Sequence, residues 1–313
     1  MTNAASDFIV THEHRRFAEF CDACRRYRYI GLCYGAAGVG KTVSARRYAN
    51  ATLLETWLSS HSMLIPDGAT GPDRATVFYT PQVVNTPRHI EHGIQTQRHQ
   101  LRMLAAEAWL ENQRHLYQVR KRDEALPPPR RLESPTRSNG NVIQIYEAAA
   151  RPATDISKTY AELRATMPDP TDLIIIDEAD RLKTASLEQV RDIFDHSHLG
   201  IVLIGMPGLE KRLSRYPQFY SRVGFVHVFR PLSAAQVRDL LQQKWVPSGV
   251  TLPEEGLADE EALAAIIRVT GGNFRLLHRL LAQVARIMEI NALQSVTSEV
   301  VEAARESLVI GTV

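Results

Sequence analysis

The chain is poor in cysteine and aromatic residues and contains no long apolar run. It has 313 residues, of which three are cysteines, and its aromatic content is 7%. Three clustered cysteines are too few for a disulfide framework, which favours a reducing, cytoplasmic setting. No apolar stretch is long enough to cross a bilayer, and the first residues lack the basic and apolar segments of a secretion signal. We therefore expect no membrane partner.

The chain also lacks an excess of charge of either sign. Its formal net charge is +2, with 44% hydrophobic and 23% charged residues, as in an ordinary globular protein. This balance excludes binding to a polyanion through overall charge, so a nucleic-acid surface would need a local cluster of basic residues. The length suits one large domain and a smaller one.

Four of the 17 glycines fall close together in the stretch GLCYGAAGVGKTVSARR, which begins at Gly31. The spacing Gly35-x-x-x-x-Gly40-Lys41-Thr42 fits the phosphate-binding P-loop, between a predicted strand and a predicted helix from Val43. Bare backbone N–H groups and the positive end of the helix dipole form an anion site there. A glycine turn that binds nothing is the alternative, but strand, turn, Lys-Thr and helix all favour the P-loop. The predicted ATP-binding residues are Gly35, Ala36, Ala37, Gly38, Val39, Gly40, Lys41, Thr42 and Val43.

The most apolar predicted strand, Leu173 to Ile176, is followed directly by Asp177 and Glu178. In P-loop enzymes the Ser/Thr after the lysine and an Asp at a strand end together hold Mg²⁺, which assigns these roles to Thr42 and Asp177. Lys41 would neutralise charge on the β- and γ-phosphates, and Glu178 would orient and deprotonate an attacking water. The alternative is that these carboxylates only cap the following helix.

Other short apolar segments predict further strands, at Ala75–Thr80, Ile201–Ile204 and Val226–Phe229. A strand that is apolar throughout is typical of a parallel sheet covered on both faces. Strands alternating with helices predict a doubly wound α/β fold. One helix is expected to run from Arg98 to Glu124 and to end before the prolines at 127–129.

After Pro231 the sequence predicts helices alone. Ser233 and Gln236 form a capping-box pattern, and Asp259, Asn273 and Ser298 mark the starts of three more helices. We therefore predict a nucleotide-binding domain at residues 1–232, with a basic insertion at about 98–140, and a helical domain at residues 233–313.

A C-x-x-C pair, Cys21 and Cys24, follows His12 and His14 and raises the possibility of a metal site. The cysteines fall on the apolar face of a predicted helix, and no second cysteine pair completes a tetrahedral site. Packing in the core is the favoured interpretation.

The segment from Arg114 to Arg137 is locally basic, with seven basic and three acidic residues, a net +4 that leaves −2 for the rest of the chain. A solvated face and a polyanion contact both fit this pattern. The candidate DNA-binding residues are Arg114, Arg120, Lys121, Arg122, Arg130 and Arg131.

Arginines that meet charge on a γ-phosphate assist phosphoryl transfer. Candidates lie in RLSRYPQFYSRVGF and behind the glycine pair at 271–272. They are Arg212, Arg215, Arg222 and Arg275.

The order of these motifs carries a resemblance. The chain resembles an AAA+ ATPase in the order of its motifs: the P-loop, a long insert, IIIDEAD, VLIGMPGLEKRL, RYPQFYSRVG and TGGNFRLLHRL. More narrowly, they resemble bacterial transposition regulators of the TnsC, TniB, MuB and IstB group. The resemblance implies an AAA+ P-loop doubly wound parallel sheet with a C-terminal helical lid domain.

By that resemblance, Arg222 is the arginine finger that reaches a neighbouring subunit's nucleotide, with Arg215 as the alternate, and Arg275 is the sensor-2 arginine. The group forms rings or helical filaments on duplex DNA with ATP and recruits or stimulates a DDE-type transposase, and hydrolysis drives release. A helicase loader, or a signalling or scaffold module without a DNA role, is the alternative. One departure is the corner at Gly205-Met206, which lacks the usual polar sensor-1 side chain and implies slow hydrolysis.

Overall fold

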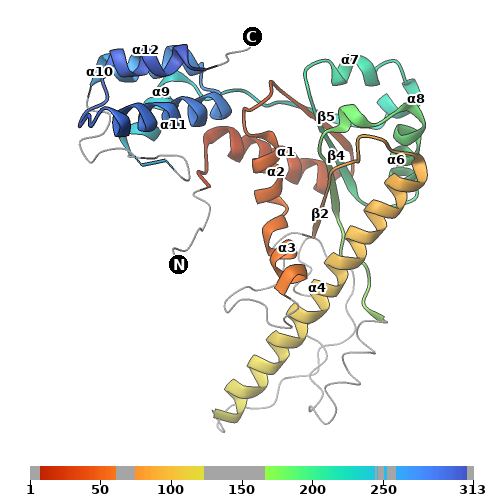
Figure 1. The fold of residues 1–313 in the computed structure, drawn as a ribbon. Coiled ribbons are helices and arrows are strands. Elements are labelled where there is room, and N and C mark those ends of the chain that lie inside the picture. The colour runs from red at the N-terminus through yellow and green to blue at the C-terminus, as the bar shows by residue number, and fades with distance from the viewer. Residues whose placement is uncertain are drawn as a thin grey trace.

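The chain is organised around a five-stranded parallel sheet (Figure 1). The computed structural model describes residues 8–60, 75–122, 166–243, 245, 250–251 and 259–308. The strands are β1 (Ile30–Tyr34), β2 (Thr76–Tyr79), β3 (Leu173–Ile176), β4 (Gly200–Gly205) and β5 (Val223–Val228). Their order is β2-β3-β4-β1-β5, and all neighbouring pairs are parallel. The carboxyl ends of β1, β4 and β3 therefore lie side by side.

Helices cover both faces of the sheet. One face packs against α1 (His12–Tyr27) and α2 (Lys41–Tyr48). The other packs against α4 (Pro87–Arg122), α6 (Thr184–Asp195), α7 (Leu209–Leu213) and α8 (Pro217–Tyr220). Side chains of β3 alternate between the two cores and are fully buried, which explains its unbroken apolar sequence. The predicted doubly wound α/β fold is confirmed.

The cysteines belong to the core beneath α1. Cys21, Cys24 and Cys33 are buried, and a Cβ at Gly31 would overlap the Cys24 sulfur, so helix and strand pack closely. Burial raises the pKa of Cys24 to about 12, which disfavours the thiolate that a metal needs. No cluster of three or more metal-ligating side chains occurs in the described residues. The prediction of core packing is confirmed.

The longest helix, α4, starts earlier than its sequence pattern predicts, at Pro87 instead of Arg98. Proline is favoured at the first position of a helix, and the Thr86 hydroxyl accepts a hydrogen bond from His89 N at 3.3 Å. The buried side chains Ile90 and Ile94 hold this first part against the sheet core. At 36 residues the helix is about 54 Å long, and its second half extends away from the sheet (Figure 1).

Two other boundaries also differ from the sequence prediction. Helix α2 begins at Lys41 instead of Val43, and β5 begins at Val223 instead of Val226. Another short helix is α3 (Ala51–Ser60), and a 3₁₀ turn, η2 (Ala179–Arg181), follows β3. No helix of the described residues is both long and apolar enough to span a membrane.

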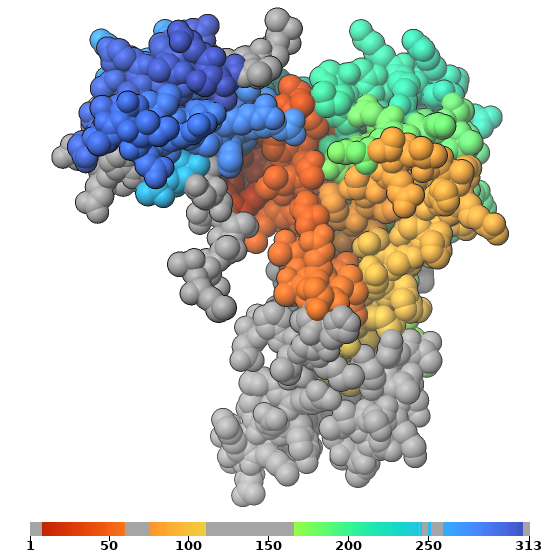
Figure 2. Space-filling view, in the orientation of Figure 1, coloured from red at the N-terminus to blue at the C-terminus, as the bar shows by residue number. Residues whose placement is uncertain are grey.

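The last four helices, which we call the lid, pack around their own core: α9 (Ala234–Gln242), α10 (Glu260–Thr270), α11 (Phe274–Ile290) and α12 (Ser298–Glu306). The predicted capping box is present, with Gln236 N 3.2 Å from Ser233 Oγ and Ser233 N 2.8 Å from Gln236 Oε1. In Figures 1 and 2 the lid, in blue, lies beside the red and orange N-terminal segment. The domain boundary at residue 232 stays a prediction.

Candidate nucleotide-binding site

The turn between β1 and α2 has a backbone geometry that suits glycine. Gly38 and Gly40 have φ values of +81° and +108°, in the left-handed region. A Cβ at Gly35 would overlap the carbonyl oxygen of Phe229. The turn opens onto the N-terminus of α2, whose first N–H groups have no partner within the helix. Together these features suit the concave anion site that the sequence predicts, which stays a prediction.

Lys41 turns back over this site. Its Nζ donates to the carbonyl oxygens of Gly35 and Ala36, each at 2.7 Å. Burial lowers the pKa of Lys41, and the nearby carboxylates of Asp177 and Asp180 oppose that change. The ammonium group therefore lies within the P-loop, in reach of an anion bound there.

The P-loop meets the apolar strand through one hydrogen bond. Thr42 Oγ1 donates to Asp177 Oδ2 at 2.7 Å, although the residues are 135 positions apart. Asp177 is 3% exposed, and its other oxygen accepts from Glu178 N at 2.9 Å. Hydroxyl and carboxylate oxygens beside a phosphate site are the donors that Mg²⁺ prefers. The residues present thus fit the predicted metal.

Glu178 follows Asp177 in the left-handed region, with φ of +50° and ψ of +42°. A non-glycine residue in this region carries local strain of the kind found at functional sites. Its carboxylate forms an ion pair with Arg181, whose Nη1 donates to Pro81 O at 2.8 Å. The side chain predicted to activate water is thus engaged by a neighbour on its own turn.

The lid contacts the P-loop directly. Asn273 Nδ2 donates to Ala37 O at 2.7 Å, and Arg275 N donates to Gly38 O at 3.2 Å. A Cβ at Gly38 would lie 2.5 Å from Asn273 Oδ1, so only glycine fits beneath the lid. Asn273 also caps α11, as predicted, by accepting from Arg275 N at 3.0 Å. Arg275 is exposed at the mouth of the site.

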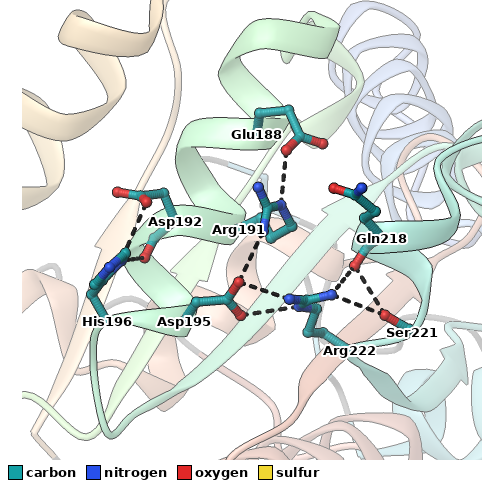
Figure 3. Close-up of polar contacts among 8 residues, drawn as sticks. All are labelled: Glu188, Arg191, Asp192, Asp195, His196, Gln218, Ser221 and Arg222. Atoms are coloured by element: carbon teal, nitrogen blue, oxygen red, sulfur yellow. Dashed lines mark hydrogen bonds and ion pairs between the residues drawn. The ribbon is translucent and has the colours of Figure 1, made fainter.

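The predicted finger, Arg222, is held within its own subunit (Figure 3). Its Nε and Nη2 donate to the two oxygens of Asp195, at 3.0 and 2.8 Å. Its Nη1 donates to Gln218 O at 2.5 Å and to Ser221 Oγ at 3.0 Å. Asp195 also accepts from Arg191 at 3.0 Å, and the hydrogen bonds from Arg222 lower its pKa.

Arg222 lies far from the P-loop of its own chain. Its carbonyl oxygen accepts from Ile30 N at 3.0 Å, at the amino end of β1, whereas the P-loop follows Tyr34 at the carboxyl end. The intervening strand spans roughly 15 Å. Arg215 is exposed, and its side chain has no partner among the described residues.

Arg212, one of the arginines considered for the γ-phosphate, is engaged by its own chain. It donates to the carbonyl oxygens of Asp180 at 2.8 Å and Leu182 at 2.5 Å, so it supports the turn after β3. The sequence reasoning gave no role to Asp180. Asp180 Oδ2 accepts from Met206 N at 2.7 Å and covers the corner after β4. The DEAD string was the available signal for Asp180, but only its first two residues received roles.

The candidate DNA-binding residues divide into two groups. Arg114, Arg120, Lys121 and Arg122 belong to the distal end of α4, which extends from the sheet. Arg130 and Arg131 lie outside the described residues.

The fold and this site define the chain as a P-loop nucleotide-binding protein of the α/β class. The sequence profile described as "AAA domain" matches residues 24–213, and the chain belongs to that family. A "potential ATP-binding protein" of Staphylococcus aureus is 41% identical to it over 308 residues, 97% of each chain.

Solved structures of AAA+ proteins have the same fold. The Aeropyrum pernix ORC2 protein in its ADPNP–ADP complexes matches with a TM-score of 0.52 and 15% identity, over 96% of this chain and 70% of that chain. A proline-to-glycine mutant of Thermotoga maritima RuvB matches with a TM-score of 0.51 and 13% identity, over 97% of this chain and 73% of that chain. At these low sequence identities the similarity shows a shared fold and nothing about function.

Proposed function

We propose that this chain is a Mg²⁺-dependent ATPase that assembles on duplex DNA in its ATP-bound state and regulates a DDE-type transposase. The observation that carries the proposal is the contact between Thr42 and Asp177 at 2.7 Å, beside Lys41 and beneath the lid. It joins a candidate phosphate site and a candidate metal-binding pair next to the lid, the combination that phosphoryl transfer uses.

For ATP hydrolysis, each site residue has a role. The P-loop N–H groups and Lys41 hold the phosphates, and Arg275 approaches them from the lid. Mg²⁺, when bound by Thr42 and Asp177, supplies charge neutralisation to the phosphates. Glu178 leaves Arg181 and accepts a proton from the attacking water. The ion pair with Arg181 is exposed and so costs little to break.

Arg222 acts on the nucleotide of a neighbouring subunit. Its position at the amino end of β5, roughly a strand length from its own P-loop, supports action across an interface. Such an arginine ties hydrolysis to assembly, because each site is complete only between two copies. The exposed Arg215 is the alternate. A ring or helical filament supplies the required head-to-tail contact.

The DNA and transposase parts of the proposal rest on the sequence resemblance and on the basic distal end of α4. Phosphate contacts need only positioned lysine and arginine, independent of sequence. The charge reversal Arg120→Glu/Lys121→Glu/Arg122→Glu should weaken DNA binding and reduce its salt slope by about 2 to 3. An unchanged affinity and slope would favour a scaffold or signalling role instead.

Electron microscopy of the protein with duplex DNA tests assembly. Rings or filaments are expected with a non-hydrolysable ATP analogue and not with ADP. Monomers under both conditions would overturn the proposed assembly. An ATPase assay with and without a DDE-type transposase, taken from a gene beside this one if such a gene exists, tests hydrolysis and the partner separately.

A further inference from the structure

The corner after β4 lies where hydrolysis needs a polar group, yet its side chains provide none. β4 is flanked by β1, which leads to the P-loop, and by β3, which leads to Asp177. The corner itself consists of Gly205 and Met206, and Met206 is 43% exposed. An attacking water has two protons, so fixing its orientation for in-line attack takes two acceptors. Glu178 accounts for one.

A carboxylate from the neighbouring turn occupies this corner. Asp180 Oδ2 accepts a hydrogen bond from Met206 N at 2.7 Å. A Cβ at Gly205 would lie 2.7 Å from that same oxygen, so the carboxylate fills the space that a side chain at 205 would take. The other oxygen, Oδ1, has no hydrogen bond to any residue that the structure describes. It is available to accept from water.

The backbone of the turn that carries Asp180 is held by one arginine. Arg212, on α7, donates to Asp180 O at 2.8 Å, to Leu182 O at 2.5 Å and to Ala179 O at 3.4 Å. One guanidinium therefore holds three carbonyl oxygens of the turn after β3. Because α7 directly follows the corner, Arg212 holds the backbone of Asp180 while Met206 N holds its carboxylate.

The charge of Asp180 also acts at the phosphate site. It raises the pKa of Lys41 against the larger lowering caused by burial, alongside Asp177. This charge and the contact with Met206 N both place Asp180 on the side of the sheet edge that faces the P-loop. Lys41, Mg²⁺ and Arg275 would offset its repulsion of the phosphates.

We propose that Asp180 is the second acceptor for the attacking water and replaces the polar side chain missing at Met206. The role rests on the proposed ATP hydrolysis. The water oxygen bonds to the γ-phosphorus while the bond from that phosphorus to the β–γ bridging oxygen breaks, and ADP keeps the electron pair. One water proton passes to Glu178. The other, which is hydrogen-bonded to Asp180, stays on the water oxygen and becomes part of the new phosphate.

The variants Asp180→Ala and Asp180→Asn test this role, with Asp239→Ala, an exposed aspartate on the lid helix α9, as the matched control. Asp180→Asn keeps the shape and can still accept from Met206 N, so it guards against misfolding. We expect both Asp180 variants to lower kcat by about 10- to 100-fold, with the Kd for ATP within about threefold of wild type. The control should match wild type.

A second readout separates water positioning from a structural role. ADP with aluminium fluoride, which mimics the state with the in-line water, should bind the Asp180 variants at least about tenfold more weakly. ADP with beryllium fluoride, which mimics the ground state, should bind them as it binds wild type. Adding Met206→Asn to Asp180→Ala should recover part of kcat, because it restores a polar side chain at the corner.

If the wild-type protein hydrolyses ATP and both Asp180 variants have the same kcat, the role of Asp180 is overturned while the proposed ATPase function stands. Equal weakening of both mimics with a lowered Tm would also overturn it, in favour of a structural role. A wild-type protein that binds ATP without hydrolysing it would overturn the proposed function itself, and the role of Asp180 with it.

Discussion

Asp195 binds the guanidinium of Arg222 through both of its oxygens, at 3.0 and 2.8 Å. Paired, parallel hydrogen bonds of this kind fix an arginine in position as well as in charge. Arg222 has to leave this partner before it can reach a neighbouring subunit. The ion pair is therefore in direct competition with the proposed assembly.

The action of Arg222 across an interface can be tested by mixing two inactive variants. Arg222→Ala keeps its own nucleotide site, and Lys41→Ala keeps Arg222, so a mixture contains sites with both groups. Each variant alone should hydrolyse ATP at least about 100-fold more slowly than wild type. The mixture should recover part of the rate. Without recovery, while the Arg215→Ala mixture recovers, Arg215 would be the finger.

Weakening the ion pair should favour assembly. Asp195→Asn removes the charge that holds Arg222, so the ATPase rate should reach half its maximum at a lower protein concentration. Glu188→Gln is the control, since Glu188 contacts Arg191 and not Arg222 (Figure 3). A concentration dependence equal to that of wild type in Asp195→Asn would show that the pair does not restrain the arginine.

The contact between Thr42 and Asp177 predicts a specific loss of Mg²⁺ dependence. Asp177→Asn and Thr42→Ala each remove a predicted metal-binding oxygen, whereas Thr42→Ser keeps the hydroxyl. ATP affinity measured with Mg²⁺ should fall by about tenfold or more in the first two variants. Affinity measured with EDTA should change little. Equal losses under both conditions would mean that the residues only shape the P-loop.

Asn273 has two roles that substitutions can separate. Asn273→Ala removes both the cap of α11 and the contact with Ala37 O, and should lower the free energy of unfolding by about 1 kcal/mol. Asn273→Asp keeps a capping oxygen but places a carboxylate beside that carbonyl and the phosphate site. It should retain stability and bind ATP more weakly than wild type. Calorimetric unfolding and a nucleotide titration check the two effects.

Burial of Asp172 predicts a pH-dependent term in stability. Burial raises its pKa to about 6, although Arg25 lies 3.4 Å away and opposes the shift. Its Oδ1 is buried and has no hydrogen-bond partner in the described residues. The folded chain therefore binds this proton more readily than the unfolded chain does. The stabilising contribution is complete below about pH 4 and is lost as the pH rises through about 6.

Asp172→Asn should remove this term. The Tm of the variant relative to wild type should increase between about pH 4 and pH 7, by the equivalent of at most about 1 kcal/mol, because solvent screens the partly exposed side chain. Asp239→Asn serves as the control and should follow the wild-type trend. A constant difference across this range would contradict the raised pKa.

The sequence by itself determined the parts that depend on neighbouring residues. The P-loop was readable because its glycines, lysine and threonine lie within residues 35–42. The strand before Asp177 was readable because burial on both faces requires apolar residues throughout. The caps at Ser233 and Asn273 were readable for the same reason, since a cap acts within one helical turn. Local periodicity did not find the first turns of α4, which are anchored by contacts with the distant sheet.

Only the tertiary structure decided which distant groups meet. Asn273 contacts Ala37 across 236 positions, and Arg222 meets Asp195 across 27. Asp180 reaches Met206 across 26 positions because β3 and β4 are neighbours in the sheet, which no local pattern states. Strand order and the placement of the lid arise from burying separate apolar surfaces together, and many sequences satisfy that requirement in different ways. The sequence thus proposed most residues of the candidate site and the pairing of Thr42 with Asp177, but the contacts of Asp180, Asn273 and Arg222 depend on the tertiary structure.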